Sequence, residues 1–331
     1  MESLAARIVD AVPTASGPIL VRDRCGRSEL VDAVVAECVQ RRLEPVVERV
    51  DNARLRGLIA STPVEALARW DLDRQHDTER VSAVISLGGW PLDTEGLPPA
   101  SLDAWGAAVG RTETAMEHRR VPMVVVAVPT AEVAAALDTT LGELDACVLP
   151  SVALSSADLC GTIAPLIEVL VAASVIEVHT AAGVLVARRG ERPLLVDDGV
   201  IDAADMAIGA TVSNLPAGSV YWTVIESETR GDVLLGDGSV LRFDGAGRVC
   251  DGTYAGERVA HIGIATNPLV TRPIGWTIVD EHRPGAVFVA LGENRYMGGN
   301  NESAINIDLL PESPTVTADS VTIVANGRLV G

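Results

Sequence analysis

The hydrophobic pattern of this chain changes near residue 175, and that change constrains the fold more than any other feature. Before it, short apolar runs alternate with longer amphipathic stretches, as in βαβ units with a parallel sheet. After it, short strands follow one another closely and are separated by Gly, Asn, Asp and Pro, as in hairpins. The sequence therefore predicts an α/β protein with a small α/β domain over residues 1–170 and a β-rich domain over residues 171–331.

Four strands are expected in the first half, namely Ile19–Asp23, Val46–Val50, Val81–Leu87 and Val121–Val128. Open α/β sheets bind ligands outside the carboxyl ends of such strands, where loops such as residues 87–91 lie. Neither Gly-x-Gly-x-x-Gly nor Gly-x-x-x-x-Gly-Lys occurs in these loops, so a dinucleotide or nucleoside-triphosphate site loses its support. We expect this half to be a scaffold that completes a cleft or a dimer.

Six strands are expected in the second half, namely Val175–Thr180, Val184–Arg188, Val220–Ile225, Val233–Gly236, Val287–Leu291 and Val321–Val324. Only 3% of the residues are aromatic although 48% are hydrophobic, so Val, Ala, Leu and Ile must build both cores. Asp197-Asp198-Gly199 reads as an acidic turn, because a calcium site would need further spaced carboxylates.

The charge of the chain argues against two classes of partner. The formal net charge is −19, which disfavours a phosphate backbone or an anionic membrane surface as the main partner. The start lacks a basic segment followed by an apolar one, and no apolar stretch reaches the length of a membrane span, so we expect a cytoplasmic protein. The five cysteines are scattered without a Cys-x-x-Cys pair, which indicates neither a disulfide framework nor a thiolate zinc site.

Three stretches of the second half combine Gly, Pro and Asn, residues that permit tight turns and left-handed backbone. They are Asn214-Leu-Pro-Ala-Gly-Ser-Val-Tyr221, His261-Ile-Gly-Ile-Ala-Thr-Asn-Pro268, and the segment that runs from Ala290-Leu-Gly through Gly298-Gly to Asn306-Ile-Asp308. In order and approximate spacing they resemble the signatures of M29-like (thermophilic-type) aminopeptidases and their dihydroxypyridine dioxygenase relatives. The resemblance implies that family's fold over residues 176–331, a metal-site pocket and a homodimer.

The resemblance also locates the positions of the family's metal ligands. Ser219 stands where an aminopeptidase has its turn glutamate, and Phe288 stands where it has a histidine. His261 occupies the position of a second metal glutamate or of a dioxygenase histidine. In the terminal His-x-Asp pair, Asn306 replaces the histidine while Asp308 remains.

Two competent donors therefore persist, His261 and Asp308, which is too few for a dinuclear site. A mononuclear site would need a third donor from Asn306 or from a displaced neighbour such as Glu293, Glu302 or His282. We expect no cofactor, and otherwise a single divalent iron or zinc ion held by His261 and Asp308 with help from Asn306.

The aromatic residues of the second half flank these motifs. Strand packing explains them, and so does a cleft that grips an organic ligand or a peptide side chain without a metal. The candidate ligand-binding residues are Ser219, Tyr221, His261, Glu293, Tyr296, Asn306 and Asp308.

Three hypotheses follow, and whether the chain is an enzyme stays open between them. The first, which we favour, is a catalytically degraded family member that binds a peptide or amino-acid-like ligand in the former active site and presents it to a partner enzyme, for instance in peptide natural-product biosynthesis. The second is an active mononuclear metalloenzyme, dioxygenase-like or hydrolytic, that uses His261 and Asp308. The third is a metal-free enzyme in which Glu293 or Glu281 acts as acid or base.

Overall fold

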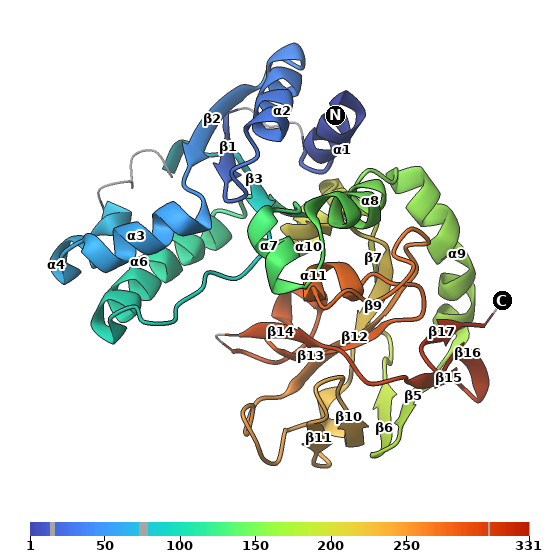
Figure 1. The fold of residues 1–331 in the computed structure, drawn as a ribbon. Helices are drawn as coiled ribbons and strands as arrows, with labels where there is room; N and C mark the ends of the chain where they lie inside the picture. Colours follow the sequence, from blue (N-terminus) through green and yellow to red (C-terminus); the bar gives the residue numbers. More distant parts are fainter. Residues whose placement is uncertain (14–16, 73–78, 304, 331) are drawn as a thin grey trace. The chain divides into compact units, whose positions relative to one another are not determined.

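The computed structural model describes residues 1–13, 17–72, 79–303 and 305–330. The chain forms two compact units, one of residues Met1–Ala153 with Gly199–Leu215 and one of residues Leu154–Asp198 with Pro216–Gly331 (Figure 1). Each unit has its own sheets and its own core.

The first unit is built on a five-stranded parallel sheet with the order β2-β1-β3-β4-β8. Its strands are β1 (Pro18–Asp23), β2 (Glu44–Arg49), β3 (Ala83–Gly88), β4 (Met123–Ala127) and β8 (Val212–Leu215). Because side chains alternate along a strand, Ile19 and Val21 point to one face of the sheet and Leu20 and Arg22 to the other. Both Ile19 and Val21 are fully buried.

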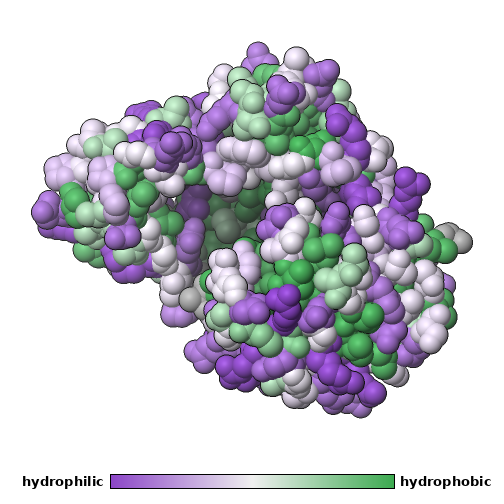
Figure 2. Space-filling view, turned by 60° about the horizontal axis from the view of Figure 1, so that its bottom comes forward, coloured by the Kyte–Doolittle hydropathy of each residue, from purple (hydrophilic) through white to green (hydrophobic). Residues whose placement is uncertain are grey.

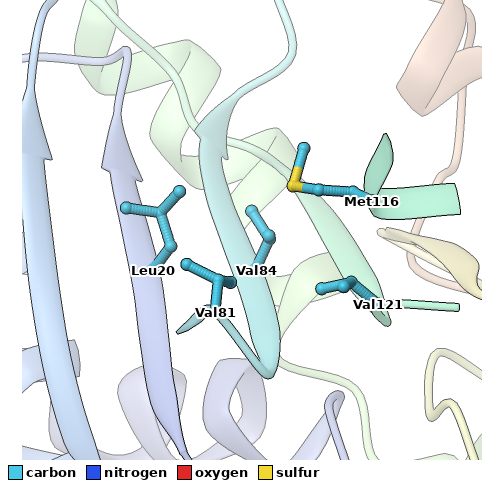
Figure 3. Packing of buried hydrophobic residues seen from close by; sticks show 5 residues of the cluster. All are labelled: Leu20, Val81, Val84, Met116 and Val121. Carbon is cyan, nitrogen blue, oxygen red and sulfur yellow. The ribbon is translucent and has the colours of Figure 1, made fainter. Parts of the chain in front are cut away.

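Helices flank this sheet. They are α1 (Glu2–Asp10), α2 (Ser28–Gln40), α3 (Asn52–Ser61), α4 (Val64–Leu67), α6 (Pro99–His118), α7 (Ala131–Ala136), α8 (Leu141–Val152) and α10 (Ala203–Ile208). Helix α2 packs on β1 and β2, whereas α3 and α4 pack on α6. Apolar side chains of β1, β3 and the end of α6 form a core cluster, which Figure 3 shows from close by: Leu20, Val81, Val84, Met116 and Val121.

The second unit contains two antiparallel sheets. A seven-stranded sheet has the order β11-β10-β6-β5-β15-β16-β17, with β5 (Val175–Thr180), β6 (Gly183–Arg188), β10 (Arg230–Leu234), β11 (Val240–Phe243), β15 (Thr315–Ala318), β16 (Val321–Ala325) and β17 (Arg328–Leu329). A five-stranded sheet has the order β14-β13-β12-β9-β7, with β7 (Leu194–Asp197), β9 (Ser219–Thr223), β12 (Val259–Ala265), β13 (Val287–Gly292) and β14 (Asn306–Leu309).

One long helix and three short helical elements complete the described part of the second unit. They are α9 (Ser156–Ala172), the 3-10 helix η1 (Glu226–Glu228), α11 (Thr277–Asp280) and the 3-10 helix η2 (Arg295–Met297). The Ser155 side chain caps α9 by accepting from the Asp158 backbone N–H, as expected for a serine before a helix. Helix α9 packs on β7 and β9.

The predicted fold class is confirmed: a parallel sheet forms early in the chain and antiparallel sheets follow it. The compact units are divided differently from the boundary set near residue 170. Helix α9 belongs to the second unit, and residues 199–215 return to the first. They return because β8 pairs in parallel with β4, with Val212 beside Met123.

Helix hydropathy and the hydropathy of the surface bear on whether the chain contacts a membrane. Among the described helices none is by itself long and apolar enough to cross a membrane, although the consecutive helices α8 and α9 pass that test when taken together. On the face drawn in Figure 2, hydrophilic residues alternate with smaller hydrophobic groups.

Candidate functional site

One face of the five-stranded sheet of the second unit carries most of the predicted site residues. In β12, His261, Gly263 and Ala265 point to this face because side chains alternate along a strand. The register places Thr223, Tyr221 and Ser219 of β9 opposite these three residues. Asp197 of β7 lies opposite Ser219, and Asp308 of β14 lies opposite Ala290 of β13, so both acidic residues belong to the same face.

The turns of the first two motifs hold each other in place. Thr266 N–H donates to the Gly218 carbonyl at 2.8 Å, and the Asn267 amide donates to the Ala217 carbonyl at 2.7 Å. Gly218 has a φ of +116°, and a Cβ there would stand 2.8 Å from the Leu159 Cδ2. Glycine is required at this turn for both reasons. The backbone conformation of these two turns thus explains why the first two motifs contain Gly218, Thr266 and Asn267.

His261 is the centre of the face. Its side chain is buried, and its Nε2 lies 3.2 Å from the Asp308 Oδ1. The Tyr221 ring lies on one side of the imidazole, with centroids 5.4 Å apart, and the Phe288 ring meets it edge-on at 5.9 Å. Asp308 is a third exposed although its Oδ1 is buried, so this carboxylate connects the buried imidazole to the surface.

Phe288 fills the middle of the face with hydrocarbon. A Cβ on Gly263 would stand 1.9 Å from the Phe288 Cζ, so the ring lies directly over the glycine. This is the position where the resemblance puts a metal-binding histidine. The phenyl ring therefore excludes water and donors from the space beside His261.

Glu281 and His282 form a second buried acid–imidazole pair in this unit. They follow α11, and His282 Nε2 lies 3.5 Å from the Glu281 Oε1. The backbone before them is fixed by Asp280, whose carboxylate accepts from the N–H groups of Ile274 and Gly275 at 2.8 Å each. Both Glu281 and His282 are more than nine-tenths buried.

The pKa values of this pair show that it is surrounded by negative charge. Burial raises the pKa of Glu281, His282 lowers it, and the carboxylates of Asp308 and Asp197 raise it further, so that it lies above its ordinary value. Burial works to lower the pKa of His282, but Glu281, Asp197 and Asp308 outweigh that effect and raise it. Asp197 and Asp308 thus act on both members of the pair, and Glu281 and His282 each hold a proton more tightly than usual.

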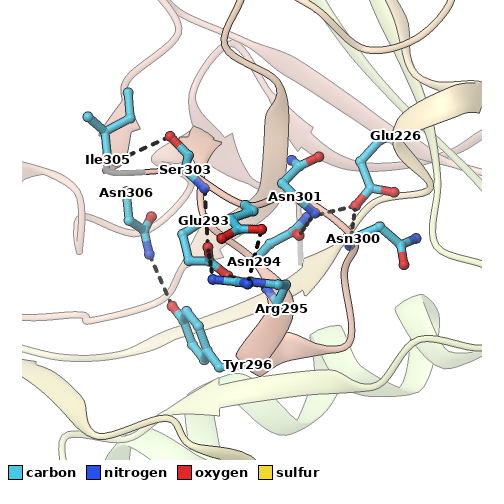
Figure 4. A network of polar contacts seen from close by, with 11 residues as sticks. Glu226, Glu293, Asn294, Arg295, Tyr296, Asn300, Asn301, Ser303, Ile305 and Asn306 are labelled. Carbon is cyan, nitrogen blue, oxygen red and sulfur yellow. Dashed lines mark hydrogen bonds and ion pairs between the residues drawn. The ribbon is translucent and has the colours of Figure 1, made fainter. Parts of the chain in front are cut away.

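Three of the predicted ligand-binding residues lie in a different set of contacts (Figure 4). The Asn306 amide donates to the Tyr296 hydroxyl at 3.1 Å, at the exposed end of β14. The Glu293 carboxylate accepts from the Arg295 guanidinium at 2.8 Å and from the Ser303 N–H at 3.2 Å. The Asn306 amide N–H, the Tyr296 hydroxyl and the Glu293 carboxylate thus have partners other than His261.

The Gly-Gly-Asn-Asn stretch of the third motif has a structural role. Buried Glu226 accepts from the Asn294 amide at 2.9 Å and from the Asn300 N–H at 3.0 Å (Figure 4). It also accepts from the Arg192 guanidinium at 2.8 Å. A Cβ on Gly299 would stand 2.0 Å from the Asn294 Oδ1. The glycine therefore makes room for the asparagine that connects this loop to Glu226.

The residues present do not fit the metal centre that the resemblance implies. Among the described residues, no three side chains of His, Cys, Asp or Glu are grouped so that they could hold a metal ion. The donor pair is His261 with Asp308, and the Phe288 ring takes the adjoining space. A three-donor facial site is not formed by this arrangement.

Asp197 was predicted to lie in an acidic turn outside the site. Glu281 was predicted only as an alternative acid or base, and His282 only as an alternative metal donor. The structure groups all three with Asp308 through their charges. A signal was available for the pair, since Glu281 and His282 belong to a run of four ionisable residues, 280–283, between apolar Ile278–Val279 and the β13 strand. No signal in the sequence places Asp197 there, because its position depends on the β7–β9 register.

Comparisons with known proteins agree with this fold. No protein-family model and no curated protein sequence matches the chain. Among solved structures, it is similar to wild-type AmpT from Thermus thermophilus, with a TM-score of 0.67, 17% identity and coverage of 100% of this chain and 99% of that chain. It is also similar to the 2,5-dihydroxypyridine dioxygenase from Pseudomonas putida KT2440, with a TM-score of 0.58, 13% identity and coverage of 100% and 96%. The fold relationship to both kinds of protein is therefore confirmed at low sequence identity.

Proposed function

We propose that the chain is a catalytically degraded relative of M29-type aminopeptidases that binds a peptide or amino-acid-like ligand through its protonated amine. The observation that carries the proposal is the concentration of Asp197, Glu281 and Asp308 beside two buried imidazoles, with Phe288 in place of a metal donor.

The charge of this cluster favours a cationic ligand. Asp197 and Asp308 both raise the pKa of buried Glu281, and a cation that approaches these carboxylates relieves their repulsion. An ammonium group supplies one positive charge and three donors, which matches carboxylate oxygens. The side chain of Asp308 is 33% exposed, whereas that of Glu281 is 10% exposed. A ligand would therefore meet Asp308 before Glu281.

The flanking rings would select the ligand's body. Tyr221 and Phe288 stand on either side of His261 and offer apolar surface next to the charged groups. An amine attached to an apolar side chain, as in an amino-terminal leucine, combines both features. In this role the chain would present its ligand to a partner enzyme, for instance one that builds a peptide natural product.

The test measures ligand binding and, with separate substrates, turnover. We expect L-leucine amide to bind in calorimetry and N-acetyl-L-leucine amide to bind about tenfold more weakly or not at all, because acetylation removes the charge. Asp308→Asn should weaken binding of the amine. Asp251→Asn, an exposed carboxylate paired with Arg242, is the matched control and should leave it unchanged.

Two results would overturn the proposal. One is metal-dependent hydrolysis of leucine p-nitroanilide or metal-dependent cleavage of a dihydroxypyridine by the purified chain. The other is equal binding of the free and the acetylated amide, which would remove the amine from recognition.

A further inference from the structure

The first unit contains a cavity of about 460 Å³, whereas the sheet face around His261 belongs to the second unit. Strands β1, β2 and β3 line one side of it, and α3, α6 and the segment after α4 line the other. Its lining includes Arg22, Arg24, Glu48, Trp70, Trp105 and Val109. Its volume is in the usual range for small-molecule sites.

The sheet divides the cavity wall into an apolar and a charged end. Leu20 packs with Val81 and Val84 towards the amino ends of the strands (Figure 3). Two residues further along β1, Arg22 stands in register with Glu48 of β2 and with Ser86 of β3. The polar row therefore lies near the carboxyl ends of the strands, where parallel sheets commonly bind ligands.

Two guanidinium groups share one carboxylate at the charged end. The Arg22 Nε lies 3.6 Å and the Arg24 Nη2 lies 3.4 Å from the same Glu48 oxygen. The Arg22 Nε is buried and has no hydrogen-bond acceptor among the described residues. Two positive charges against one negative charge leave an excess positive charge at this wall, and a buried donor without an acceptor is unfavourable.

Gly88 allows Arg24 to take its position. A Cβ on Gly88 would stand 2.8 Å from the Arg24 Cβ, so a larger residue would push the arginine away. The one further carboxylate that lines the cavity, Glu113 of α6, is exposed at the rim and is screened by solvent.

Two tryptophans line the opposite side. The rings of Trp70 and Trp105 meet edge-to-face, with centroids 5.2 Å apart and planes at 75°. Both side chains are half-buried, and Leu55 and Val109 line the cavity with them. A cavity lined by rigid aromatic rings and by arginines suits a ligand that is flat and apolar at one end and anionic at the other.

We propose that this cavity binds an organic anion with an aromatic body, a carboxylate or a phosphate monoester. Arg22 and Arg24 hold the acid group, which supplies the acceptor that the Arg22 Nε lacks. Trp70 and Trp105 hold the aromatic body. The site is independent of the sheet face around His261, so its failure and that of the proposed amine binding are distinguishable.

The experiment titrates the full chain with naphthoate, naphthyl phosphate and the neutral naphthalenemethanol in a calorimeter. We expect at least one of the two anions to bind and the alcohol to bind about tenfold more weakly or not at all. The stronger of the two anions identifies the acid group. Arg22→Gln should weaken binding of that anion about tenfold or more. Arg41→Gln, an exposed arginine at the end of α2, is the matched control and should leave it unchanged.

A second variant keeps the test decisive if Arg22→Gln fails to fold. Val109→Trp adds an indole to the cavity from α6 and should abolish binding of the anion while the circular dichroism spectrum stays that of the parent. Absence of binding by both anions to the parent chain, equal binding of anion and alcohol, or undiminished binding to Val109→Trp would each overturn the proposal.

Discussion

The phenyl ring of Phe288 occupies the space in which a side chain on Gly263 would begin. A Cβ at position 263 would stand 1.9 Å from the Phe288 Cζ and 2.2 Å from its Cε2, far inside van der Waals contact. The two residues are paired in register on adjacent strands, β12 and β13. Glycine and phenylalanine are therefore complementary here, and the pair holds the ring edge-on to His261.

Gly263→Ala should destabilise the second unit, because the added methyl group overlaps the ring and neither strand can move freely. We expect a loss of about 3 kcal/mol in the free energy of unfolding, at the upper end of overpacking effects. Phe288→Ala alone should cost about 3–5 kcal/mol, because it leaves a cavity.

The double variant distinguishes this steric relationship from two independent losses. If the ring is what Gly263 accommodates, Gly263→Ala should cost little in a Phe288→Ala background, so the two effects are strongly non-additive. Urea unfolding of the four proteins measures this. Additive losses would show that the glycine is needed for its backbone and not for the ring.

Phe288→His should create a metal site, because it adds an imidazole beside His261 and Asp308. Three donors of this type suffice for zinc, whereas two bind it weakly. We expect zinc to raise the melting temperature of Phe288→His and to leave the parent unchanged. Phe243→His, at the chain's other phenylalanine, is the control because it is equally buried on β11. Equal increases in the melting temperature of the two variants with zinc would contradict the placement of residue 288 beside His261 and Asp308.

Strands β1 to β6, β9, β10, β13 and β16 were predicted from the sequence, because their apolar residues alternate or run together between turn residues. Strands β7, β8, β11, β12, β14, β15 and β17 were not predicted. Val84, Ile85 and Leu87 of β3 and Val124 and Val126 of β4 are buried in a parallel sheet, as largely apolar runs indicate. The short strand β8 was not anticipated, since its exposed Val212 and polar Ser213 and Asn214 look like a loop. Its pairing with β4 also explains why the compact units interleave along the chain.

The candidate site was predictable only where a motif names the residue. His261 and Asp308 come together as the resemblance implies, at 3.2 Å. Glu293 and Tyr296 were chosen from the same motif but contact Arg295 and Asn306. Which charged group lies near which is decided by strand register and by loop hydrogen bonds, and neither is encoded in residue type or spacing.

Glu226→Gln should destabilise the chain by about 3 kcal/mol, because it removes a buried charge whose partner Arg192 then stays buried and uncompensated. Glu228→Gln, two residues away in η1, is the matched control. Its ion pair with Arg188 is half exposed, so we expect a change within about 0.5 kcal/mol. Guanidinium unfolding at neutral pH measures both. Similar effects of the two substitutions would show that burial of Glu226 is unimportant.

The Glu226 effect should also depend on pH in a defined direction. Burial alone would raise its pKa, but the Asn300 N–H, the Asn294 amide and Arg192 lower it below the ordinary value of 4.5. A lowered pKa in the folded state means that its stabilising contribution is present above pH 4.5 and is lost as the pH falls below it. The difference between Glu226→Gln and the parent should therefore shrink in acid.

The pair of Glu281 and His282 should give the opposite pH dependence. Both groups have raised pKa values in the folded state, so the folded chain holds their protons more tightly than the unfolded chain does. The stability contributed by protonated His282 is fully present below pH 6.5, its ordinary value, and is lost as the pH rises through the raised value. The stability contributed by protonated Glu281 has the same pH dependence. It is fully present below pH 4.5, the ordinary value, and is lost as the pH rises through the raised value.

Urea unfolding between about pH 5 and pH 9 tests this, since the slope of stability against pH counts the protons bound. We expect the parent to lose stability with rising pH and His282→Gln to lose less, because glutamine does not titrate and only Glu281 of the pair still does. His179→Gln is the control, since His179 is 39% exposed on β5 and its removal should leave the slope of the parent. If His282→Gln keeps the parent's slope, His282 does not hold its proton more tightly in the folded chain, and the charge cluster behind the proposed amine site loses this support.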